Sequence, residues 1–377
     1  MTIVILSAAA FCLITFILHV ASIIIAVTRC RVDRGYELPP LDAPPVSLVR
    51  PVCGMDNYCE ETLRSTFELD YPYYEILFCA AKAIDPVLPT LERLTAAHPH
   101  VEAKILIGDD KISTNPKLNN VVKGWRAASF PWIVIADSNV LMPRDYIQRL
   151  LSTWRLGTGL VCSPPVGSRP TNLWAELECA FLNTHEARWQ YVADSIGLGF
   201  AQGKSMLWRR EVLERSGGIE ALGSELAEDA ASTKLVRQMG LRVRLVDRPF
   251  EQPLGTRSPA EVWNRQLRWA RLRRASFKPF FIPEILTGGL FPLVSCALAA
   301  DWSGFSPLSA LLVVGTAWYG AEALMSRASG WHTSMRAPLV WMLRDLLLPA
   351  LWIQAWLGST FVWRGNHMQV ARSKTAG

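Results

Sequence analysis

Four acidic residues of this chain lie at the edges of hydrophobic or amphipathic runs, where a carboxylate can hold a metal ion or move a proton. Asp137 closes the run WIVIAD, Asp85 follows the run YEILFCAA, and Glu228–Asp229 open an amphipathic stretch. In an α/β sheet, ligands bind beyond the carboxyl ends of the strands. A carboxylate there can hold a divalent cation on a nucleotide diphosphate, and a buried one can act as a general base.

Each of these acids also has a structural explanation. Asp137 can be a turn residue, and the third position of its D-x-D-like motif is Asn139, a weaker metal ligand. Asp85 precedes Pro86 and can cap a helix as well as contact a nucleoside. The acids Glu228–Asp229 complement the dipole of the helix that they begin. The residue types alone leave both interpretations open.

A basic segment, NRQLRWARLRR, occupies residues 264–274 and holds five arginines and no acid. Arg265 and Arg268 are three residues apart, so on a helix they share a face suited to bidentate contact with a phosphate. Trp269 beside them can stack on a sugar ring or pack in a core. The later basic residues fit a belt facing anionic lipid headgroups: Arg271, Arg273, Arg274 and Lys278.

These residues need a scaffold, and the pattern around them predicts a doubly wound α/β domain with a mostly parallel sheet. The expected strands are 46–52, 74–81, 103–108, 132–138, 159–166 and 242–247. The expected helices include 58–69, 86–97, 119–128 and 143–153. Polar residues at the strand ends therefore matter most for function.

An apolar segment precedes this domain. Residues 3–27 contain no Lys, Arg, Asp or Glu and are long enough to cross a bilayer as a helix. A signal peptide would have a shorter apolar region, with its basic residues in front. Here Arg29, Arg31 and Arg34 follow the run, so the positive-inside rule places the chain after residue 28 in the cytoplasm.

After residue 282 the chain becomes apolar again. Residues 283–300 and 304–325 are expected to form two further spans. A third stretch, 338–363, contains Arg344–Asp345 and two prolines, and it either spans or lies partly in the interface. Helix count and charge disagree on the side of the membrane that holds the tail 364–377, so that side stays open.

The composition separates this chain from ordinary soluble proteins and from nucleic-acid binders. Half of its 377 residues are hydrophobic and only 19% are charged. The net charge of +6 suits contact with anionic lipid or a phosphorylated substrate. Because the basic segment abuts a membrane segment, no nucleic-acid partner is expected. The eight cysteines include no CxxC pair, which argues against a zinc site or a disulfide framework.

Taken in order, the motifs resemble the ceramide glucosyltransferase family of membrane-bound, inverting glycosyltransferases. The resemblance runs from about residue 46 to residue 274. It rests on the segments VSLVRPVCGMD, TFELDYPYYEILFC, NPKLNN, IADSNV, FLNTHEARW, GKSMLWRREVL, AEDAAS and RQLRW. It implies a GT-A fold, Rossmann-like with a mostly parallel sheet, in a cytoplasmic domain joined to transmembrane helices.

The resemblance also implies roles for the acids and the basic motif. Asp85 is then expected on the nucleotide, and Asp137 is expected to place a divalent cation, Mg²⁺ or Mn²⁺, and the diphosphate. Asp229 is expected to be the catalytic base. The segment RQLRW, with Arg265, Arg268 and Trp269, matches the (Q/R)xxRW motif, which closes over the diphosphate and the acceptor.

Two further matches are less specific. His185, in NTHEARW, matches a family histidine near the acceptor site, although a lone histidine is more often structural. Lys117, Asn119 and Asn120 match the NPK-NN run, where a lysine near phosphates is expected, although such loop residues are usually only solvated.

The reaction implied by the family is transfer of glucose from UDP-glucose to the primary hydroxyl of ceramide, with inversion, giving a β-glucosyl lipid. UDP-galactose or UDP-N-acetylglucosamine as donor, and a hopanoid or diacylglycerol as acceptor, stay open. An interpretation of another class is a non-catalytic, membrane-anchored nucleotide-binding module. The protein is expected to be a multi-pass protein of the bacterial inner membrane, or of the Golgi in a eukaryote.

These expectations divide the chain into six parts. They are a transmembrane anchor (1–28), a Pro-rich linker (29–45), a GT-A catalytic domain (46–263), a basic interfacial segment (264–282), a C-terminal transmembrane region of two or three spans (283–363) and a tail (364–377).

Overall fold

A computed structural model describes residues 2–31, 35–40, 42–363 and 366–369. The chain forms two compact units. The helical unit comprises Met1–Val32, Arg169–Val192 and Thr256–Gly377, and the sheet unit comprises Asp33–Ser168 and Ala193–Gly255. Parts of the expected linker (32–34 and 41) and most of the expected tail (364–365 and 370–377) lie outside the described residues.

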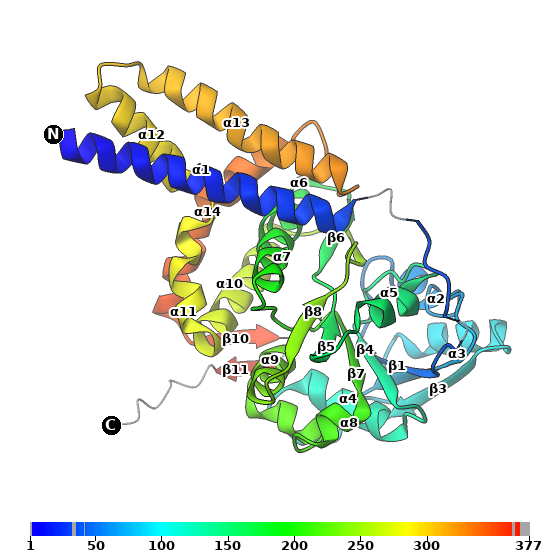
Figure 1. Cartoon of the computed structure of the whole chain (residues 1–377). Helices are drawn as coiled ribbons and strands as arrows, with labels where there is room; N and C mark the ends of the chain where they lie inside the picture. The colour runs from blue at the N-terminus through cyan, green and yellow to red at the C-terminus, as the bar shows by residue number, and fades with distance from the viewer. Residues whose placement is uncertain (1, 32–34, 41, 364–365, 370–377) are drawn as a thin grey trace, which may run out of the picture. The chain divides into compact units, whose positions relative to one another are not determined.

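The sheet unit contains seven strands in the order β3-β2-β1-β4-β7-β5-β8 (Figure 1). Their bounds are β1 Val46–Val52, β2 Tyr74–Ala80, β3 Glu102–Ile107, β4 Trp132–Ala136, β5 Thr158–Cys162, β7 Ser205–Arg209 and β8 Arg242–Leu245. The pairs β1–β2, β1–β4, β2–β3 and β5–β8 are parallel, whereas β7 runs antiparallel to β4 and β5. The expected mostly parallel sheet is confirmed.

Two strand predictions need correction. β7, which was not expected, begins directly after the turn at Gly203–Lys204. The strand expected at 159–166 ends at Cys162, since Pro164 and Pro165 lack the N–H that a ladder requires. The chain continues as β6, Val166–Pro170, which pairs with β9, Glu251–Gly255, in a separate two-stranded sheet.

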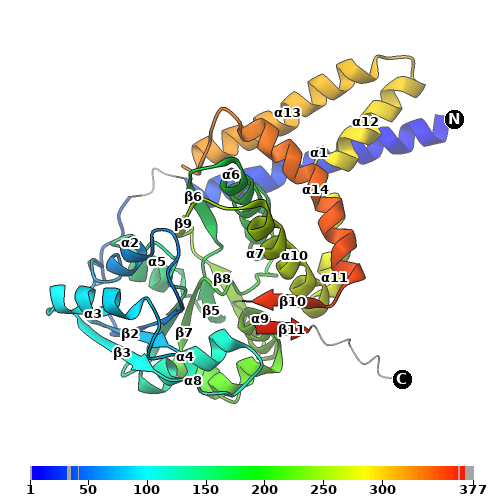
Figure 2. The same cartoon turned by 180° about the vertical axis from the view of Figure 1, so that it is seen from behind.

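Helices cover both faces of the large sheet (Figures 1 and 2). They are α2 Cys59–Arg64, α3 Leu88–Ala97, α4 Pro116–Ala127, α5 Tyr146–Thr153, α8 Arg210–Glu214, η2 Ile219–Ser224 and α9 Glu228–Gln238. Leu91 of α3 packs with Phe78 of β2 in one buried cluster. On the opposite face, Gly124 of α4 lies against Val49 and Cys79, so closely that a side chain there would overlap both. This alternation is the doubly wound arrangement expected from the sequence.

The helical unit contains most of the remaining helices. Their bounds are α1 Thr2–Cys30, α6 Leu173–Cys179, η1 Ala180–Ala187, α7 Arg188–Ser195, α10 Pro259–Ser276, α11 Lys278–Phe281, η3 Ile282–Leu286, α12 Leu290–Trp302, α13 Pro307–Ala328 and α14 Ala337–Leu357. Helices α1, α12 and α13 lie side by side (Figures 1 and 2). Leu177 and Phe181 pack with Trp341 of α14, which explains why residues 169–192 join this unit and not the sheet.

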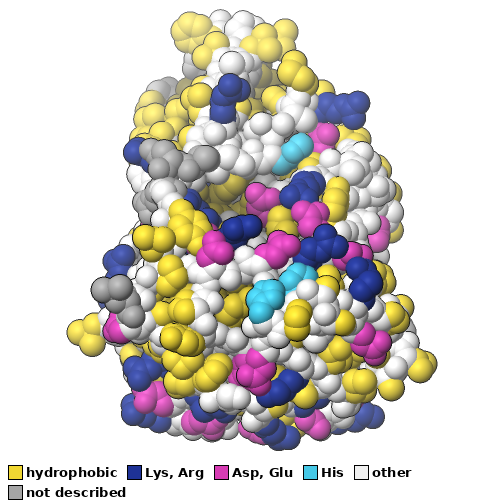
Figure 3. Space-filling model, turned by 90° about the vertical axis from the view of Figure 1, so that its right-hand side faces the viewer, with side chains coloured by type: hydrophobic (Ala, Val, Ile, Leu, Met, Phe, Trp, Pro, Cys, Tyr) yellow, Lys and Arg dark blue, Asp and Glu magenta, His cyan; other side chains and the backbone are white. Residues whose placement is uncertain are grey.

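Among the described residues, two helices, α1 and α13, are long and apolar enough to cross a membrane. The segments Lys278–Leu286 and Leu290–Trp302 pass the same test only as a pair bent by 43°. The span expected at 283–300 is therefore bent, at Gly288–Gly289. Hydrophobic side chains are frequent at the top of the space-filling view (Figure 3), and Leu13, Ile14 and Ile17 of α1 are each more than half exposed.

The third apolar stretch, 338–363, is a helix for only part of its length. Helix α14 ends at Leu357, and Thr360–Trp363 forms β10, which pairs antiparallel with β11, Asn366–Gln369. Arg344 and Asp345 are almost fully buried in α14, where both contact other parts of the helical unit. Their charges are paired inside the protein and do not face lipid.

Candidate active site

The sheet unit gathers four charged side chains at the carboxyl end of β4. Asp137 is the first residue after this strand, and Lys117 of α4 lies 2.7 Å from its Oδ1. Lys204, which directly precedes β7, lies 3.0 Å from Oδ2. The Lys117 ammonium also lies 2.6 Å from Glu228 Oε1 and donates to the Gly203 carbonyl at 2.6 Å. All three ammonium protons of Lys117 therefore have acceptors.

Asp229 lies beside this cluster at the start of α9. Its Oδ2 accepts a hydrogen bond from the Gly203 N–H at 3.3 Å, and its Oδ1 accepts one from Ala230 N–H at 2.8 Å. Glu228 is fixed on its other side by Asn115 Nδ2 at 2.7 Å. A Cβ atom at Gly203 would lie 3.0–3.4 Å from Glu228, Lys117 and Asp229. A glycine at this position therefore lets the three side chains meet.

The two aspartates, Asp137 and Asp229, differ in the pKa of their carboxyl groups. Burial acts to raise the pKa of Asp137, but Lys117 and Lys204 outweigh it and hold that pKa well below its usual range. Burial and then the neighbouring Glu228 carboxylate raise the pKa of Asp229 to about 6, against the opposing effect of Lys117. Asp137 is thus a permanent anion, whereas Asp229 can take up a proton near neutral pH, as a general base must.

A buried arginine, which was not expected from the sequence, fixes the Asp137 loop. Arg50, inside β1, is fully buried and donates to the carbonyls of Asp137 at 2.8 Å and Val140 at 3.1 Å. The same guanidinium donates to the Thr62 carbonyl at 2.8 Å. An arginine in the hydrophobic strand VSLVRPV was the available signal, because a buried charge needs several partners. Lys204 and Asn115 were likewise not singled out, and Glu228 was named only together with Asp229.

Asp85 and the asparagines of NPKLNN have structural contacts. Asp85 accepts hydrogen bonds from Gly54 N–H at 2.9 Å and Val87 N–H at 3.1 Å, which tie the loop after β2 to the loop after β1. Asn119 accepts from Ser113 N–H, and Asn120 donates to the Cys79 carbonyl. Both asparagines are buried, so the expectation of solvated loop residues is wrong. The helix expected at 119–128 begins earlier, at Pro116.

The basic motif lies on α10 in the helical unit. A capping box between Ser258 and Glu261 starts this helix. Arg265 makes an ion pair with Glu178 of α6, a carboxylate that is fully buried. Arg268 and Trp269 are half-buried on the same helix. The arginine expected at the diphosphate thus has a carboxylate partner within its own unit.

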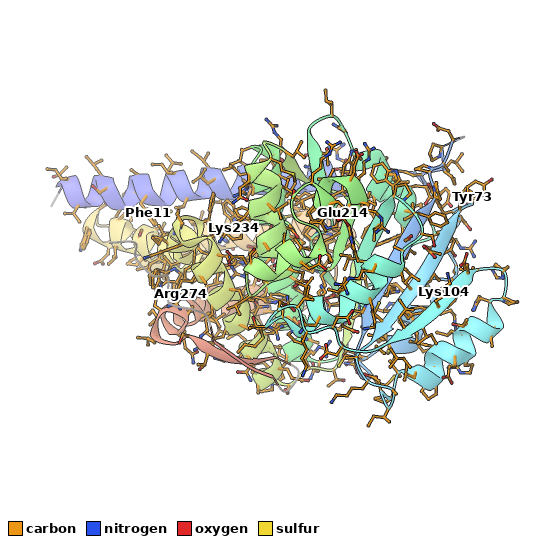
Figure 4. All side chains as sticks on the ribbon, turned by 90° about the horizontal axis from the view of Figure 1, so that it is seen from below. Phe11, Tyr73, Lys104, Glu214, Lys234 and Arg274 are labelled. Carbon is orange, nitrogen blue, oxygen red and sulfur yellow. The ribbon has the colours of Figure 1, made fainter. Side chains whose placement is uncertain are left out.

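Three of the four basic residues expected to face lipid headgroups have partners inside the helical unit, and the fourth, Lys278, is exposed. Arg273 pairs with Glu284, and Arg271 donates to the Thr360 carbonyl. Arg274 donates to the carbonyls of Trp356 and Gly358, and it lies beside the C-terminal strands in Figure 4. Their guanidinium groups satisfy carbonyls and carboxylates inside the helical unit, a tertiary role that the spacing alone did not reveal.

His185 lies on η1, a π-helical segment in the middle of the continuous helix α6–η1–α7. Such segments widen a helix and are frequent at functional sites. The buried ring contacts Thr287 Oγ1 through Nε2 at 2.8 Å. Burial, followed by nearby Arg344, holds the pKa of His185 well below its usual range, so the ring is neutral.

The comparison with protein families decides the assignment. The model of glycosyl transferase family 21 matches residues 14–376. The chain belongs to glycosyl transferase family 21. Within the part that the structure describes, the family-21 match covers both units, so the helices of the helical unit belong to the family pattern as much as the sheet does.

Curated relatives agree with this family, and a solved structure agrees with the fold. Ceramide glucosyltransferase 1 of Caenorhabditis elegans is 26% identical over 373 residues, covering 97% of this chain and 79% of that protein. Ceramide glucosyltransferase of Komagataella phaffii is 27% identical, and the match covers 86% of this chain and 82% of that protein. The mannosyltransferase PcManGT from Pyrobaculum calidifontis, solved with GDP-Man and Mn²⁺, gives a TM-score of 0.52 at 18% identity. The superposition covers 90% of this chain and 99% of that chain. The GT-A fold is confirmed, and this family-21 protein is a hexosyltransferase.

The oxygen ligands of the sheet unit fit a divalent cation. The Lys204 ammonium lies 3.0 Å from Asp137 Oδ2 and 3.1 Å from Asn139 Oδ1, so a cationic group already occupies the position between these two oxygens. One carboxylate and one amide oxygen are a typical protein share of a Mg²⁺ site that substrate phosphates complete. Among the described residues, no group of three or more His, Cys, Asp and Glu side chains forms a metal site without substrate.

The two units therefore hold different parts of the expected site. The sheet unit brings Asp137, Lys117 and Asp229 together around Gly203, and Asp85 follows β2 at the same edge of the sheet. The helical unit holds Arg265, Arg268, Trp269 and His185.

Proposed function

We propose that this family-21 enzyme transfers glucose from UDP-glucose to the primary hydroxyl of ceramide, with inversion at the anomeric carbon. The observation that carries the proposal is the contrast between Asp137 and Asp229, which are linked through Lys117 and Gly203. One carboxylate has a pKa of about 6 and the other is a permanent anion held by two lysines. The curated relatives named as ceramide glucosyltransferases support the choice of sugar and lipid.

In the proposed reaction, Asp229 accepts the proton of the lipid hydroxyl. The oxygen forms a bond to the anomeric carbon while the bond to the UDP oxygen breaks on the opposite face, and UDP leaves with the electron pair. An α-linked donor then gives a β-linked product. Near pH 7 most Asp229 side chains are ionised, because their pKa is about 6, so the base is available.

The leaving diphosphate needs positive charge around it. Lys117 is our proposed phosphate contact, because it is a flexible point charge that can exchange one carboxylate for a phosphate oxygen. Arg265 and Arg268 are proposed to bind the diphosphate as well, and Asp85 the nucleoside. A divalent cation, held by Asp137 and Asn139 when bound, supplies charge neutralisation on the departing UDP.

The remaining assignments concern the lipid and the membrane. We propose Trp269 and His185 as contacts of the acceptor. The residue ranges proposed for the anchor (1–28), the catalytic domain (46–263) and the C-terminal region (283–363) are kept from the sequence. The basic residues after α1 favour a multi-pass protein with its catalytic domain on the cytoplasmic side.

The test is a product assay with purified protein in detergent. Ceramide is offered with UDP-glucose, UDP-galactose or UDP-N-acetylglucosamine, with Mg²⁺ or EDTA, and products are identified by mass spectrometry. A hexosylceramide formed from UDP-glucose and lost with EDTA is the expected result. Its anomeric configuration, read by NMR, should be β, and an α-linked product contradicts the single displacement.

Other results of this assay would change specific parts of the proposal. Product only from another donor overturns the choice of glucose and keeps the mechanism. Protein that binds UDP but makes no ceramide product with any donor overturns the choice of acceptor. Hopanoid and diacylglycerol acceptors are then offered in the same assay.

A further inference from the structure

The Lys204 side chain holds the position that the proposed divalent cation needs. Its ammonium lies 3.0 Å from Asp137 Oδ2 and 3.1 Å from Asn139 Oδ1. These two oxygens are the oxygen pair proposed for the cation. A metal ion that uses both of them has to stand where the Lys204 ammonium stands. Binding of the ion therefore requires either the lysine side chain or the oxygen pair to move.

The main chain around Asp137 is fixed, so the lysine side chain is the part that can move. The Asp137 N–H donates to the Lys204 carbonyl at 3.0 Å, and the Asp137 carbonyl accepts from Arg50 at 2.8 Å. The Lys204 ammonium is a point charge on a flexible stem, and its side chain is 17% exposed. Its displacement breaks the contact with Asp137 but no backbone hydrogen bond.

Lys117, the second lysine beside Asp137, is held more firmly. Its ammonium lies 2.7 Å from Asp137 Oδ1 and 2.6 Å from Glu228 Oε1, and it donates to the Gly203 carbonyl at 2.6 Å. Its side chain is 11% exposed, less than that of Lys204. A metal ion that approaches from solvent therefore displaces Lys204 before Lys117.

The charges of the site decide what can displace Lys204. The two lysines match the carboxylates of Asp137 and Glu228 in number. A divalent cation alone brings two more positive charges close to two ammonium groups, and like charges at short range repel. A nucleotide diphosphate brings the negative charge that offsets this addition, and its oxygens give the released ammonium new acceptors. The site therefore suits metal and diphosphate together better than the metal alone.

We propose that Lys204 is a built-in counter-ion, which keeps a divalent cation away from the oxygen pair of Asp137 and Asn139 until a nucleotide diphosphate binds. Lys204 then releases Asp137 and contacts the diphosphate, so metal and nucleotide bind cooperatively. The inference rests on the diphosphate site of the proposed function and is independent of the sugar and the lipid. By linkage, the nucleotide raises the metal affinity by the same factor as the metal raises the nucleotide affinity.

This role and a purely structural one predict opposite effects on metal binding. If Lys204 only stabilises the loop after β4, its removal lowers the unfolding temperature and leaves the metal affinity unchanged or weaker. If Lys204 excludes the metal, its removal strengthens metal binding in the absence of nucleotide, because the ion no longer competes with an ammonium group. The direction of the change in metal affinity therefore distinguishes the two roles.

The experiment measures Mn²⁺ binding to the full-length protein in detergent, with and without UDP, from the electron paramagnetic resonance signal of the free ion. Mn²⁺ prefers the same oxygen ligands as Mg²⁺. In wild type, UDP should raise the Mn²⁺ affinity about 100-fold. Lys204→Met should bind Mn²⁺ alone about 10-fold more tightly than wild type, and the effect of UDP should shrink by about the same factor. Lys104→Met, an exposed lysine beside two carboxylates on the sheet, is the matched control and should behave as wild type.

Two further variants assign the effect to this site. Adding Asp137→Asn to Lys204→Met should abolish the tightened binding, which separates the oxygen pair from adventitious sites for Mn²⁺. Lys204→Arg keeps the positive charge and should keep the weak binding of Mn²⁺ alone. Thermal unfolding checks that each variant is folded, and Lys204→Gln replaces Lys204→Met in the same measurement if the methionine variant does not fold.

Wild type that binds Mn²⁺ equally well with and without UDP overturns the inference without any variant. Folded Lys204→Met with unchanged or weaker affinity for Mn²⁺ alone overturns the role of Lys204. The proposed reaction is tested separately. Cooperative binding that Lys204→Met weakens, in a protein that makes no glucosylceramide, refutes the reaction and keeps the counter-ion. Glucosylceramide formation by wild type, with the cooperativity unchanged in Lys204→Met, does the reverse.

Discussion

The sheet unit and the helical unit each bury a cluster of charges, but they hold them differently. In the sheet unit, the Lys117 cluster consists of Lys117, Asp137, Lys204 and Glu228, and the Asp137 side chain is 24% exposed. In the helical unit, the Arg344 cluster consists of Arg188, Glu322, Arg344 and Asp345, and none of its side chains is more than 2% exposed. The Lys117 cluster can therefore exchange its partners with a ligand from solvent, whereas the Arg344 cluster cannot.

The choice of basic residue matches this difference. Arg344 contacts both oxygens of Glu322, at 2.9 and 3.0 Å, and also donates to Asp345 at 2.9 Å. This fork geometry uses the planar guanidinium fully and gives a fixed structure. Lys117 and Lys204 are point charges on flexible stems, which can follow a carboxylate or release it. We infer that the Arg344 cluster stabilises the fold and the Lys117 cluster serves the reaction.

The strongest test of this comparison is Asp229→Asn. The substitution removes the proposed base but keeps the shape of the side chain, so turnover should fall about 1,000-fold, which is about 4 kcal/mol of transition-state stabilisation. UDP affinity should change less than about threefold. Steady-state rates and equilibrium UDP binding measure the two effects. Glu102→Gln, an exposed acid on β3, is the control and should keep full activity.

Arg344→Met tests the other cluster. It leaves Glu322 and Asp345 buried without their main counter-charge, which should lower the free energy of unfolding by about 3–5 kcal/mol. Thermal unfolding in detergent measures the loss. Arg327→Met, at the exposed end of α13, is the matched control and should leave the unfolding temperature nearly unchanged. If the protein tolerates Arg344→Met but loses UDP binding, the structural role assigned to this cluster is wrong.

The sequence was sufficient to predict the parts of the fold that have local signals. Alternating hydrophobic runs located β1, β2, β3, β4 and β8 within one or two residues. The antiparallel β7 was missed, because strand direction depends on which strands are neighbours and not on the segment itself. The bend before α12 was also missed, although Gly288–Gly289 was visible in the sequence.

The residues of the candidate site were also predictable only in part. Asp137 and Asp229 have residue types and positions that indicate chemistry, and the structure brings them together around Gly203. Glu228 and Arg50 could not be assigned in advance, since their importance comes from contacts across 87 to 113 positions of the chain. The arginines after Trp269 were predicted to face lipid, because spacing cannot reveal that Arg273 has Glu284 as a partner.

A smaller effect is expected from Asp137→Asn. The change removes the anion that Lys117 and Lys204 hold and weakens the oxygen pair proposed for the divalent cation. UDP affinity in the presence of Mg²⁺ should fall about 10-fold, and the difference between Mg²⁺ and EDTA should nearly vanish. Titration of UDP with and without the metal measures both. Asp110→Asn, a surface acid that pairs with Arg126, is the control, and an unchanged metal dependence in Asp137→Asn contradicts the assigned role.

The smallest expected effect is a shift in pH dependence. With the pKa of Asp229 at about 6, the base is protonated and inactive below that pH, so kcat/KM should rise as the pH increases through about 6 and level off above it. Glu228→Gln removes the neighbouring negative charge that helps to raise this pKa. The rise of kcat/KM with pH should therefore move to lower pH, by less than about one unit. This rising part of the pH profile is its acidic limb.

The direction of this shift separates two roles for Glu228. If Glu228 only tunes its neighbour, the limb moves down while kcat at pH 8 stays within about threefold of wild type. If Glu228 is itself the base, Glu228→Gln abolishes turnover at every pH and Asp229→Asn does not. Lys117→Met should shift the acidic limb in the opposite direction. Lys117 lowers the pKa of Asp229, so its loss should move the limb to higher pH. Opposite shifts from two residues that form one ion pair would show that the Lys117 cluster sets the proton affinity of the base.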